Sequence, residues 1–337
     1  KKFLTAEENF FHAVQNHKNN NLEFAENLYK KALKMNPNHF ESIYYLGALL
    51  AQTKKFLLSK SLFEKAIQIK PDYANSYFNL GIVLEELEEN EKAIICYEKA
   101  IQIKPDYIKA HNNLGTLLEK LNKNQKAIIC YEKAIQIKPD IAESHYNLGM
   151  VFLKLQNYQK AIICYEKAIT IQPNYTNAHY NLGTILHELG EHQKAINCYE
   201  RAIQINPNYT DAYNNLGILF KKIGQYQKAI VCYKKAIQID PNNTNIINSL
   251  SSLLKIIRLD NLTNHRNDLK ELFLFLFRKN NINHADIFNN AKLILFIEKN
   301  NNQLKKIVNS NSLLLKNKNI QNLLKEELFL LMLQKTL

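Results

Sequence analysis

Five asparagines that recur at one constant interval are the side chains in this sequence best suited to chemistry, and that chemistry is binding. A carboxamide offers two N–H donors and a carbonyl acceptor. It can therefore pair with both the N–H and the C=O of an extended polypeptide, whatever side chains that polypeptide carries. A ladder of such groups would hold a peptide by its backbone. The five residues are Asn79, Asn113, Asn147, Asn181 and Asn215.

The five cysteines recur at the same interval and are poor candidates for disulfides. The axes of packed helices lie ~8–10 Å apart, whereas a disulfide needs Cα atoms within about 7 Å. Cysteines at equivalent positions of a stacked array therefore cannot pair in sequence. We expect them to act as small apolar side chains, and free thiols suit a reducing compartment such as the cytoplasm. They are Cys96, Cys130, Cys164, Cys198 and Cys232.

The sequence shows no pattern typical of a catalytic, metal or cofactor site. His187 and His192 form the nearest approach to a zinc-binding string, but they are five residues apart and Gly190 puts a turn between them. One helix face therefore cannot aim both rings at one metal. No two glycines are closer than seven residues, which argues against a phosphate-binding loop. We predict no catalytic residue, no metal and no cofactor in this chain.

Prolines and glycines mark the elements that must position these side chains. All seven prolines of the chain keep the interval of the asparagines, and so do six of its eight glycines. A fixed period of about 34 residues with helical patterning inside it is typical of a stacked array of helix–turn–helix repeats. The prolines are Pro37, Pro71, Pro105, Pro139, Pro173, Pro207 and Pro241. The glycines are Gly47, Gly81, Gly115, Gly149, Gly183 and Gly217.

Each repeat contains two helical patterns separated by a short polar turn. Leu80 and Gly81 lie on one face of the first helix of a typical repeat, and Ala93, Tyr97 and Ala100 lie on one face of the second. Glycine costs a helix about 1 kcal/mol relative to alanine. Its return in every repeat is explained if the helices approach too closely there for a β-carbon.

These residues resemble the tetratricopeptide repeat (TPR). The family shares the Leu-Gly of the first helix, the Ala, Tyr and Ala of the second and the terminal proline. The resemblance implies an all-α fold, a right-handed superhelix whose first helices line the concave side. After a lead at 1–5 we predict seven repeats, a capping helix at 244–258 and a C-terminal helical region at 259–337. The repeats are 6–39, 40–73, 74–107, 108–141, 142–175, 176–209 and 210–243.

Residues 40–243 are also similar to the repeat arm of O-linked N-acetylglucosamine transferases and their bacterial relatives, in strings such as Ala110-His-Asn-Asn-Leu-Gly. In that family an asparagine ladder holds the substrate polypeptide. The resemblance implies the same duty for the five asparagines, although consensus asparagines without that duty remain an alternative. We expect micromolar or weaker binding, strengthened by groove side chains. Those are Phe78, Tyr146, Tyr180, Ile82, Met150 and Ile218.

The groove edge carries an acidic end and a basic end that could orient a peptide, although ordinary solvated charges remain the alternative. The residues are Glu85, Glu86, Lys120, Lys154, Lys221 and Lys222. We predict a protein-interaction scaffold that binds an extended polypeptide. The alternative is the recruiting arm of a larger enzyme, either a glycosyltransferase of that type or an S-adenosylmethionine-dependent methyltransferase, whose catalytic domain is not in this chain.

The charge of the chain supports a third and weaker alternative. The net charge is +13, of which +6 lies up to residue 243 and +7 lies in 244–337. That basic segment could bind RNA or a membrane surface. Aromatic residues interleaved as for base stacking are not evident in it, so we expect no nucleic-acid partner. No stretch reaches the roughly 20 apolar residues that a membrane-spanning helix needs. Both ends look like cuts, which suggests a longer parent protein.

Overall fold

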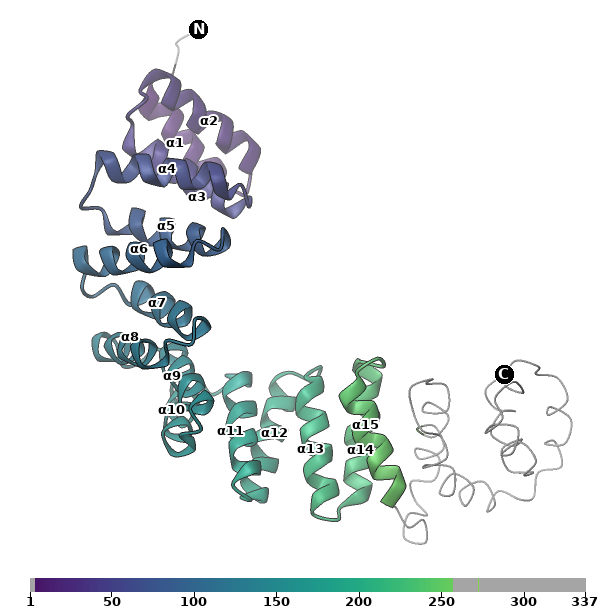
Figure 1. The fold of residues 1–337 in the computed structure, drawn as a ribbon. Helices are drawn as coiled ribbons and strands as arrows, with labels where there is room; N and C mark the ends of the chain where they lie inside the picture. The colour runs from purple at the N-terminus through teal and green to yellow at the C-terminus, as the bar shows by residue number, and fades with distance from the viewer. Residues whose placement is uncertain (1–3, 257–271, 273–337) are drawn as a thin grey trace, which may run out of the picture. The chain divides into compact units, whose positions relative to one another are not determined.

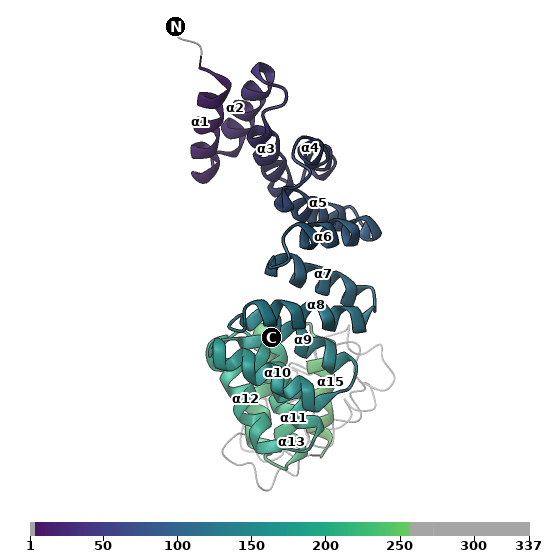
Figure 2. The ribbon, with the colours of Figure 1, turned by 90° about the vertical axis from the view of Figure 1, so that its left-hand side faces the viewer.

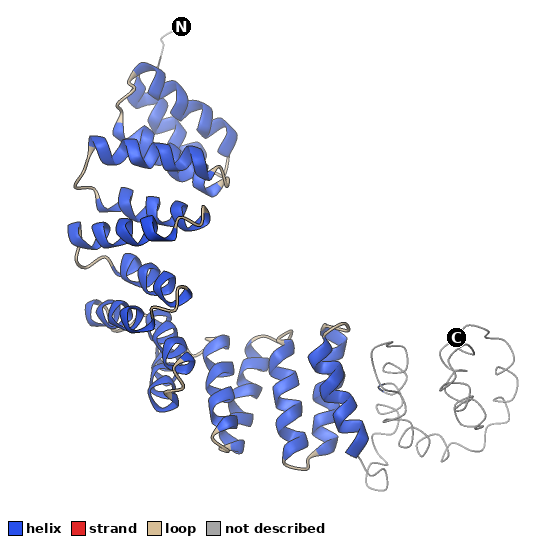
Figure 3. Ribbon diagram, viewed as in Figure 1, coloured by secondary structure: helices blue, strands red, loops and turns tan. Residues whose placement is uncertain are grey.

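The computed structural model describes residues 4–256 and residue 272, and its regular elements there are all helices (Figures 1 and 3). The all-α fold expected from the repeat pattern is therefore confirmed. The chain divides into two compact units, residues 1–173 and 174–337. They are called the N-terminal unit and the C-terminal unit below, and the described residues of each form a stack of helix pairs.

The N-terminal unit contains five helix pairs. In every pair the first helix has 13 residues and the second has 14. The first helices are α1 (Ala6–Lys18), α3 (Phe40–Gln52), α5 (Ala74–Glu86), α7 (Ile108–Lys120) and α9 (Ala142–Lys154). The second helices are α2 (Leu22–Met35), α4 (Phe56–Ile69), α6 (Asn90–Ile103), α8 (Asn124–Ile137) and α10 (Tyr158–Ile171).

The described part of the C-terminal unit contains two further pairs and one more helix. The first helices are α11 (Thr176–Glu188) and α13 (Thr210–Lys222), and the second helices are α12 (His192–Ile205) and α14 (Tyr226–Ile239). The last described helix is α15 (Thr244–Ile256), which packs against both α13 and α14. The predicted cap at 244–258 ends two residues beyond the described helix, and the predicted region 259–337 lies outside the described residues except for Leu272.

Helices pack first within their pair and then against the next pair. The two helices of a pair make the most extensive contacts, as α5 and α6 do in both Figure 1 and Figure 2. First helices of successive pairs also touch one another: α1 with α3, α3 with α5 and α7 with α9 in the N-terminal unit, and α11 with α13 in the C-terminal unit. Side chains at the same position of successive first helices are thereby brought onto one face of each unit.

The recurring glycine is explained by the ring that faces it. A β-carbon at Gly81 would lie 2.6 Å from Cε1 of Tyr97, and one at Gly115 would lie 2.8 Å from Cε1 of Tyr131. Both tyrosines are completely buried. These separations are well inside van der Waals contact, so the expected close approach of the two helices is confirmed. The tyrosine ring fills the space that the missing β-carbon leaves.

The turn inside each pair is closed by one residue with left-handed backbone geometry. In the first five pairs this residue is not glycine, for example Glu88 at φ 58° and Asn122 at φ 58°. The following N–H reaches back to the helix, as Lys123 N–H does to the Leu118 carbonyl at 2.8 Å. This bond belongs to a common helix-ending motif. It satisfies a carbonyl group at the helix end and offsets the cost of the left-handed residue.

The limits between repeats stay a prediction. A repeat boundary is a choice of where to start counting along the period, so helix bounds alone do not decide it. The described helix pairs nevertheless keep the interval of the prolines, because the first helices begin at Ala6, Phe40, Ala74, Ile108, Ala142, Thr176 and Thr210.

Candidate peptide-binding face

The five ladder asparagines lie at one equivalent position of five first helices. Asn79, Asn113 and Asn147 are on α5, α7 and α9 of the N-terminal unit, and Asn181 and Asn215 are on α11 and α13 of the C-terminal unit. All five side chains are half-buried. Part of each side chain is therefore accessible to a ligand, and part is packed against the protein.

Tyrosine hydroxyl groups on the preceding first helix hold two of the ladder amides. Nδ2 of Asn79 donates to the hydroxyl of Tyr44 at 2.9 Å, and Nδ2 of Asn215 donates to the hydroxyl of Tyr180 at 3.0 Å. Each bond joins residues 35 positions apart, one more than the repeat period. The bond uses one N–H of the carboxamide. At Asn79 this leaves the second N–H and the carbonyl oxygen for another partner, whereas the Asn215 side chain also has the Tyr199 hydroxyl as a neighbour.

Asn113 is held in a different way, through a buried tyrosine and a carboxylate. Burial raises the pKa of the Tyr97 hydroxyl well above its ordinary range, so the hydroxyl keeps its proton and donates it to the Glu85 carboxylate. The Asn113 side chain lies near the same hydroxyl and works against the rise of its pKa. Because the hydroxyl proton is donated to Glu85, Asn113 can approach this oxygen only as a donor.

The predicted aromatic contacts form the wall of this face more than its surface. Phe78 is only 9% exposed and packs against Tyr97 and Tyr107, with ring centroids 5.9 and 5.0 Å apart. Tyr146 and Tyr180 are half-buried. Tyr146 packs against the second-helix Tyr165, its centroid 5.7 Å away, and Tyr180 packs against Tyr199 and Tyr209. These rings fix the shape of the face and offer edges to a ligand.

The predicted aliphatic contacts lie beside the ladder asparagines within each unit. Ile82, Met150 and Ile218 are half-buried and follow a ladder asparagine by three positions on α5, α9 and α13. A spacing of three places each of them next to its asparagine on the helix surface. They can therefore contact the side chains of a peptide whose backbone meets the asparagines.

The predicted charges lie near the C-terminal ends of the first helices. Lys154 on α9 donates to the Glu119 carbonyl of α7 at 3.1 Å, and Lys221 on α13 donates to Ser252 of α15 at 2.9 Å. Burial raises the pKa of Glu85 and of Glu119 above the ordinary carboxyl value. The nearby ammonium of Lys120 works against that rise at Glu85. An orienting role for these charges stays a prediction.

Glu85→Gln is expected to stabilise the fold at neutral pH and to flatten its pH dependence. Because the pKa of Glu85 is raised in the folded protein, its charged form costs stability near pH 7. That cost is relieved as the pH falls through the folded pKa, and it is gone below the ordinary value of 4.5. Glutamine removes the charge and keeps an acceptor for Tyr97. The midpoint of urea unfolding, measured from pH 7 to pH 4.5, tests this expectation. The exposed neighbour Glu86, changed to glutamine, is the control, and an equal response of both variants would contradict it.

The asparagine that precedes the ladder residue Asn113 has a structural role. The side chain of Asn112 on α7 donates to Ser144 on α9 at 2.9 Å and accepts from it at 3.0 Å, and both residues are buried. Asn214 occupies the same position on α13, and its Oδ1 is buried without a hydrogen-bond partner. The ladder position and the position before it therefore serve different purposes.

The sequence reading missed the tyrosine hydroxyl groups. Tyr44 had no predicted role, and Tyr180 was predicted only as a groove contact. The signal that could have revealed them is an aromatic residue one position before the ladder site of the preceding repeat. Tyr44 stands in that relation to Asn79, and Tyr180 to Asn215.

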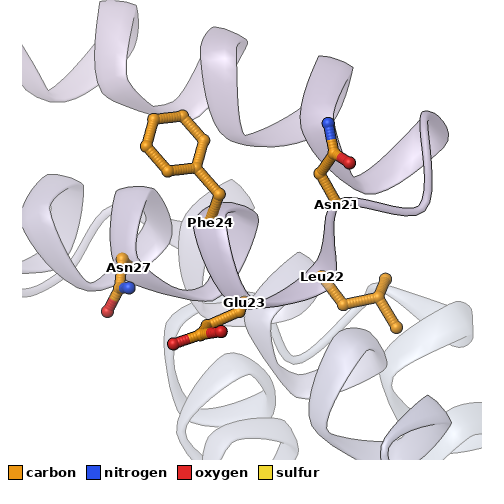
Figure 4. Close-up of a pocket in the computed structure, with 5 residues that line it drawn as sticks. All are labelled: Asn21, Leu22, Glu23, Phe24 and Asn27. Atoms are coloured by element: carbon orange, nitrogen blue, oxygen red, sulfur yellow. The ribbon is translucent and has the colours of Figure 1, made fainter.

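No other described feature offers chemistry at this face. His187 and His192 lie with ring centroids 6.2 Å apart, and the described residues contain no group of three potential metal ligands. A hollow of about 410 Å³ opens at the start of α2, remote in sequence from the ladder (Figure 4). Its lining residues are Asn21, Leu22, Glu23, Phe24 and Asn27. Among the described helices, none is long and apolar enough to cross a membrane.

Comparison of the sequence with models of known protein families identifies the repeat. Family models described as tetratricopeptide repeat or TPR repeat match most of the helical array. The matched residues are 28–58, 62–95, 85–122, 108–141, 140–208 and 210–243. A search of curated protein sequences finds no match.

Two solved structures show the same fold. The C-terminal part of a TPR repeat-containing protein from Cytophaga hutchinsonii has a TM-score of 0.61 at 18% identity, covering 72% of this chain and 99% of that one. Pseudomonas aeruginosa pilF has a TM-score of 0.56 at 21% identity, covering 63% of this chain and 97% of that one. These structures share the fold, and the family-model matches show that the chain belongs to the tetratricopeptide repeat family.

Proposed function

We propose that this protein binds an extended polypeptide through the backbone, using the asparagine ladder of its first helices. TPR arrays are protein-interaction modules that present their surfaces to partner chains. The observation that carries the finer proposal is the hydrogen bond between Asn79 and Tyr44, repeated between Asn215 and Tyr180. A carboxamide held by one N–H is oriented before a ligand arrives and still offers one donor and one acceptor.

The spacing of the rungs suits an extended chain. Neighbouring helices lie ~8–10 Å apart, and an extended polypeptide advances about 3.3 Å per residue. Each asparagine would thus meet about every third residue of the peptide. Asn79, Asn113 and Asn147 form three consecutive rungs within the N-terminal unit.

The expected affinity is modest. A net hydrogen bond contributes about 0.5–1.5 kcal/mol, and association has a large entropic cost that must be met first. Orientation by tyrosine reduces part of that cost. Micromolar or weaker binding follows, with side-chain contacts from Ile82 and Met150 adding to it.

The recruiting arm of a glycosyltransferase or methyltransferase is the alternative within this proposal. The glycosyltransferase version rests on the resemblance of the asparagine ladder to that of the O-linked N-acetylglucosamine transferases, and the methyltransferase version rests on the region that follows the repeats. Both versions assign the same binding role to this chain and differ only in whether the parent protein adds a catalytic domain. Sequencing the parent gene would separate them.

Asn79→Ala/Asn113→Ala/Asn147→Ala is expected to weaken peptide binding by tenfold or more. The triple change removes three rungs worth about 0.5–1.5 kcal/mol each. The probe is a fluorescein-labelled 12-residue peptide, (Gly-Ser-Gln)4, and the measurement is its fluorescence anisotropy against protein concentration. A neutral peptide of this kind reports on the backbone.

The matched control changes asparagines outside the ladder. Asn27 and Asn197 are exposed and lie on second helices, so Asn27→Ala/Asn197→Ala should leave the affinity unchanged. Circular dichroism checks that every variant keeps its helices. If the triple ladder variant is folded and binds like the wild type, the ladder has no role in binding.

A further inference from the structure

The ladder position changes character in the first two helix pairs. Tyr45 on α3 stands at the position of Asn79 one repeat earlier, and Phe11 on α1 stands there two repeats earlier. Phe11 is 58% exposed and Tyr45 is 40% exposed. Tyr45 keeps this exposure although its ring lies 5.7 Å from that of Phe10 and 5.4 Å from that of Tyr44. Because five later repeats place asparagine here, the two aromatic residues, called the aromatic pair below, are a local departure from the array.

A glutamate lies one helical turn before each member of the aromatic pair. Glu7 precedes Phe11 by four residues, and Glu41 precedes Tyr45 by four residues. Residues four apart share a helix face, so each ring has a carboxylate beside it on the same surface. The Glu7 side chain is 76% exposed and the Glu41 side chain is 43% exposed. The five later repeats lack this pairing of a carboxylate with a ring, because they carry asparagine in place of the ring.

A histidine links the two carboxylates without removing their charge. Nδ1 of His39 accepts the backbone N–H of Ser42 at 3.2 Å, so the ring proton sits on Nε2. Nε2 donates to Glu7 at 2.8 Å and lies 3.8 Å from a carboxylate oxygen of Glu41. The ring of Phe10 completes the cluster, since its centroid is 5.4 Å from His39 and 5.7 Å from Tyr45. These contacts join α1 to α3 and hold the two glutamates close together.

A cationic side chain of the protein itself, that of Lys70, already binds beside Glu41. Nζ of Lys70 lies 3.0 Å from a carboxylate oxygen of Glu41 and 4.0 Å from the centroid of the Phe40 ring. An ammonium group thus sits between a carboxylate and an aromatic face, which is the arrangement that cationic side chains favour. The lysine and the glutamate are both nearly half exposed, so this ion pair is weak and exchanges readily.

The charge of the surrounding helices favours a basic ligand. The first helices α1, α3 and α5 contain Glu7, Glu8, Glu41, Glu85 and Glu86 against the single lysine Lys18, a net charge of −4 with neutral histidine. The whole chain carries +13. A basic peptide is therefore attracted to these first helices more than to the rest of the chain.

We propose that the aromatic pair, with Glu7 and Glu41, binds arginine or lysine side chains of the extended polypeptide, so that the first two helix pairs select a basic segment. This inference rests on the proposed function, because it assumes that the same peptide continues along the ladder. A guanidinium can stack on a ring and pair with a carboxylate at the same time. Four intervals of ~8–10 Å between five first helices match the roughly 40 Å length of 12 extended residues.

The test uses three labelled peptides that differ only in charge: (Gly-Ser-Arg)4, (Gly-Ser-Gln)4 and (Gly-Ser-Glu)4. The wild-type protein is expected to bind the arginine peptide about tenfold more tightly than the glutamine peptide, and the glutamate peptide no better than the glutamine peptide. Phe11→Asn/Tyr45→Asn installs the residue that later repeats carry. It should bring the arginine preference below about threefold without weakening the glutamine peptide, which two added ladder asparagines can only bind more tightly. Cation–π contacts of about 0.5–1 kcal/mol at exposed sites set this scale.

Phe24→Asn is the matched control. Phe24 is 57% exposed, nearly the same as Phe11, but it lies on the second helix α2. This variant should keep the full arginine preference. A preference that survives Phe11→Asn/Tyr45→Asn in a folded protein, or one that Phe24→Asn removes equally, overturns the proposal.

The two proposals fail in different ways. If the ladder variant loses all three peptides while Phe11→Asn/Tyr45→Asn changes nothing, the backbone ladder stands and the basic-segment site is wrong. If the aromatic variant removes the arginine preference while the ladder variant binds like the wild type, the basic-segment site stands and the ladder is wrong.

Discussion

Gly149→Leu is expected to lower the free energy of unfolding by about 3 kcal/mol, because overpacking a filled interface typically costs about 1–3 kcal/mol and leucine adds four carbons at a point of close contact. A β-carbon at Gly149 would lie 2.8 Å from Cε1 of Tyr165 and 3.2 Å from Cβ of Cys164. Tyr165 is completely buried and Cys164 nearly so. The gain in helix propensity from replacing glycine, under about 1 kcal/mol, is too small to compensate.

Urea unfolding followed by circular dichroism measures this effect. Arrays unfold by nearest-neighbour steps, so the midpoint and the steepness of the transition are both compared with the wild type. Lys126→Leu adds the same side chain at an exposed second-helix position and should change the stability by less than about 0.5 kcal/mol. A neutral Gly149→Leu would show that the first and second helices of this pair do not meet at the glycine.

The sequence was sufficient to predict the helix pairs, because proline, glycine and the apolar pattern all repeat together. The constant period indicated the fold class, and the cost of a helical glycine indicated the close approach at Gly81. The sequence did not show which side chain fills the space beside Gly81. Tyr97 was known only to lie on an apolar face of the second helix, and its contact with Gly81 depends on how the two helices cross.

The partners of the ladder asparagines could not be predicted from the repeat alone. Asn79 bonds to Tyr44, which lies 35 positions earlier, one more than the repeat period. The additional residue reflects the offset between adjacent first helices, which is a property of their packing and not of the period. Phe78 gives the opposite lesson. It was expected to contact a ligand, but Tyr107, the last residue of the same repeat and the one directly before α7, packs against its ring and leaves 9% of it exposed.

The turns were also beyond the sequence pattern. Left-handed residues are usually glycine, as at Gly190 and Gly224, yet the chain places Glu88 and Gln156 in the same geometry. Glutamate and glutamine do not favour a positive φ, so their presence does not predict a left-handed turn. The packing of the flanking helices imposes the turn.

An ester version of the neutral peptide is expected to bind the wild-type protein about a hundredfold more weakly. Esters replace the backbone N–H groups of (Gly-Ser-Gln)4 by oxygen and make its carbonyls poorer acceptors, but they leave every side chain in place. The three rungs Asn79, Asn113 and Asn147 each lose a hydrogen bond worth about 0.5–1.5 kcal/mol, and a hundredfold corresponds to about 2.7 kcal/mol. A protein that recognised side chains alone would bind both forms equally.

The most direct test of the proposed ladder combines this ester peptide with Asn79→Ala/Asn113→Ala/Asn147→Ala in a double-mutant cycle. Four dissociation constants are measured by anisotropy: amide and ester peptide, each against the wild type and the triple variant. We predict that the ester weakens binding about a hundredfold in the wild type and by less than about threefold in the variant, a coupling set by the bonds that the asparagines lose. Equal ester effects in both proteins would contradict the claim that these asparagines bind the backbone of the peptide.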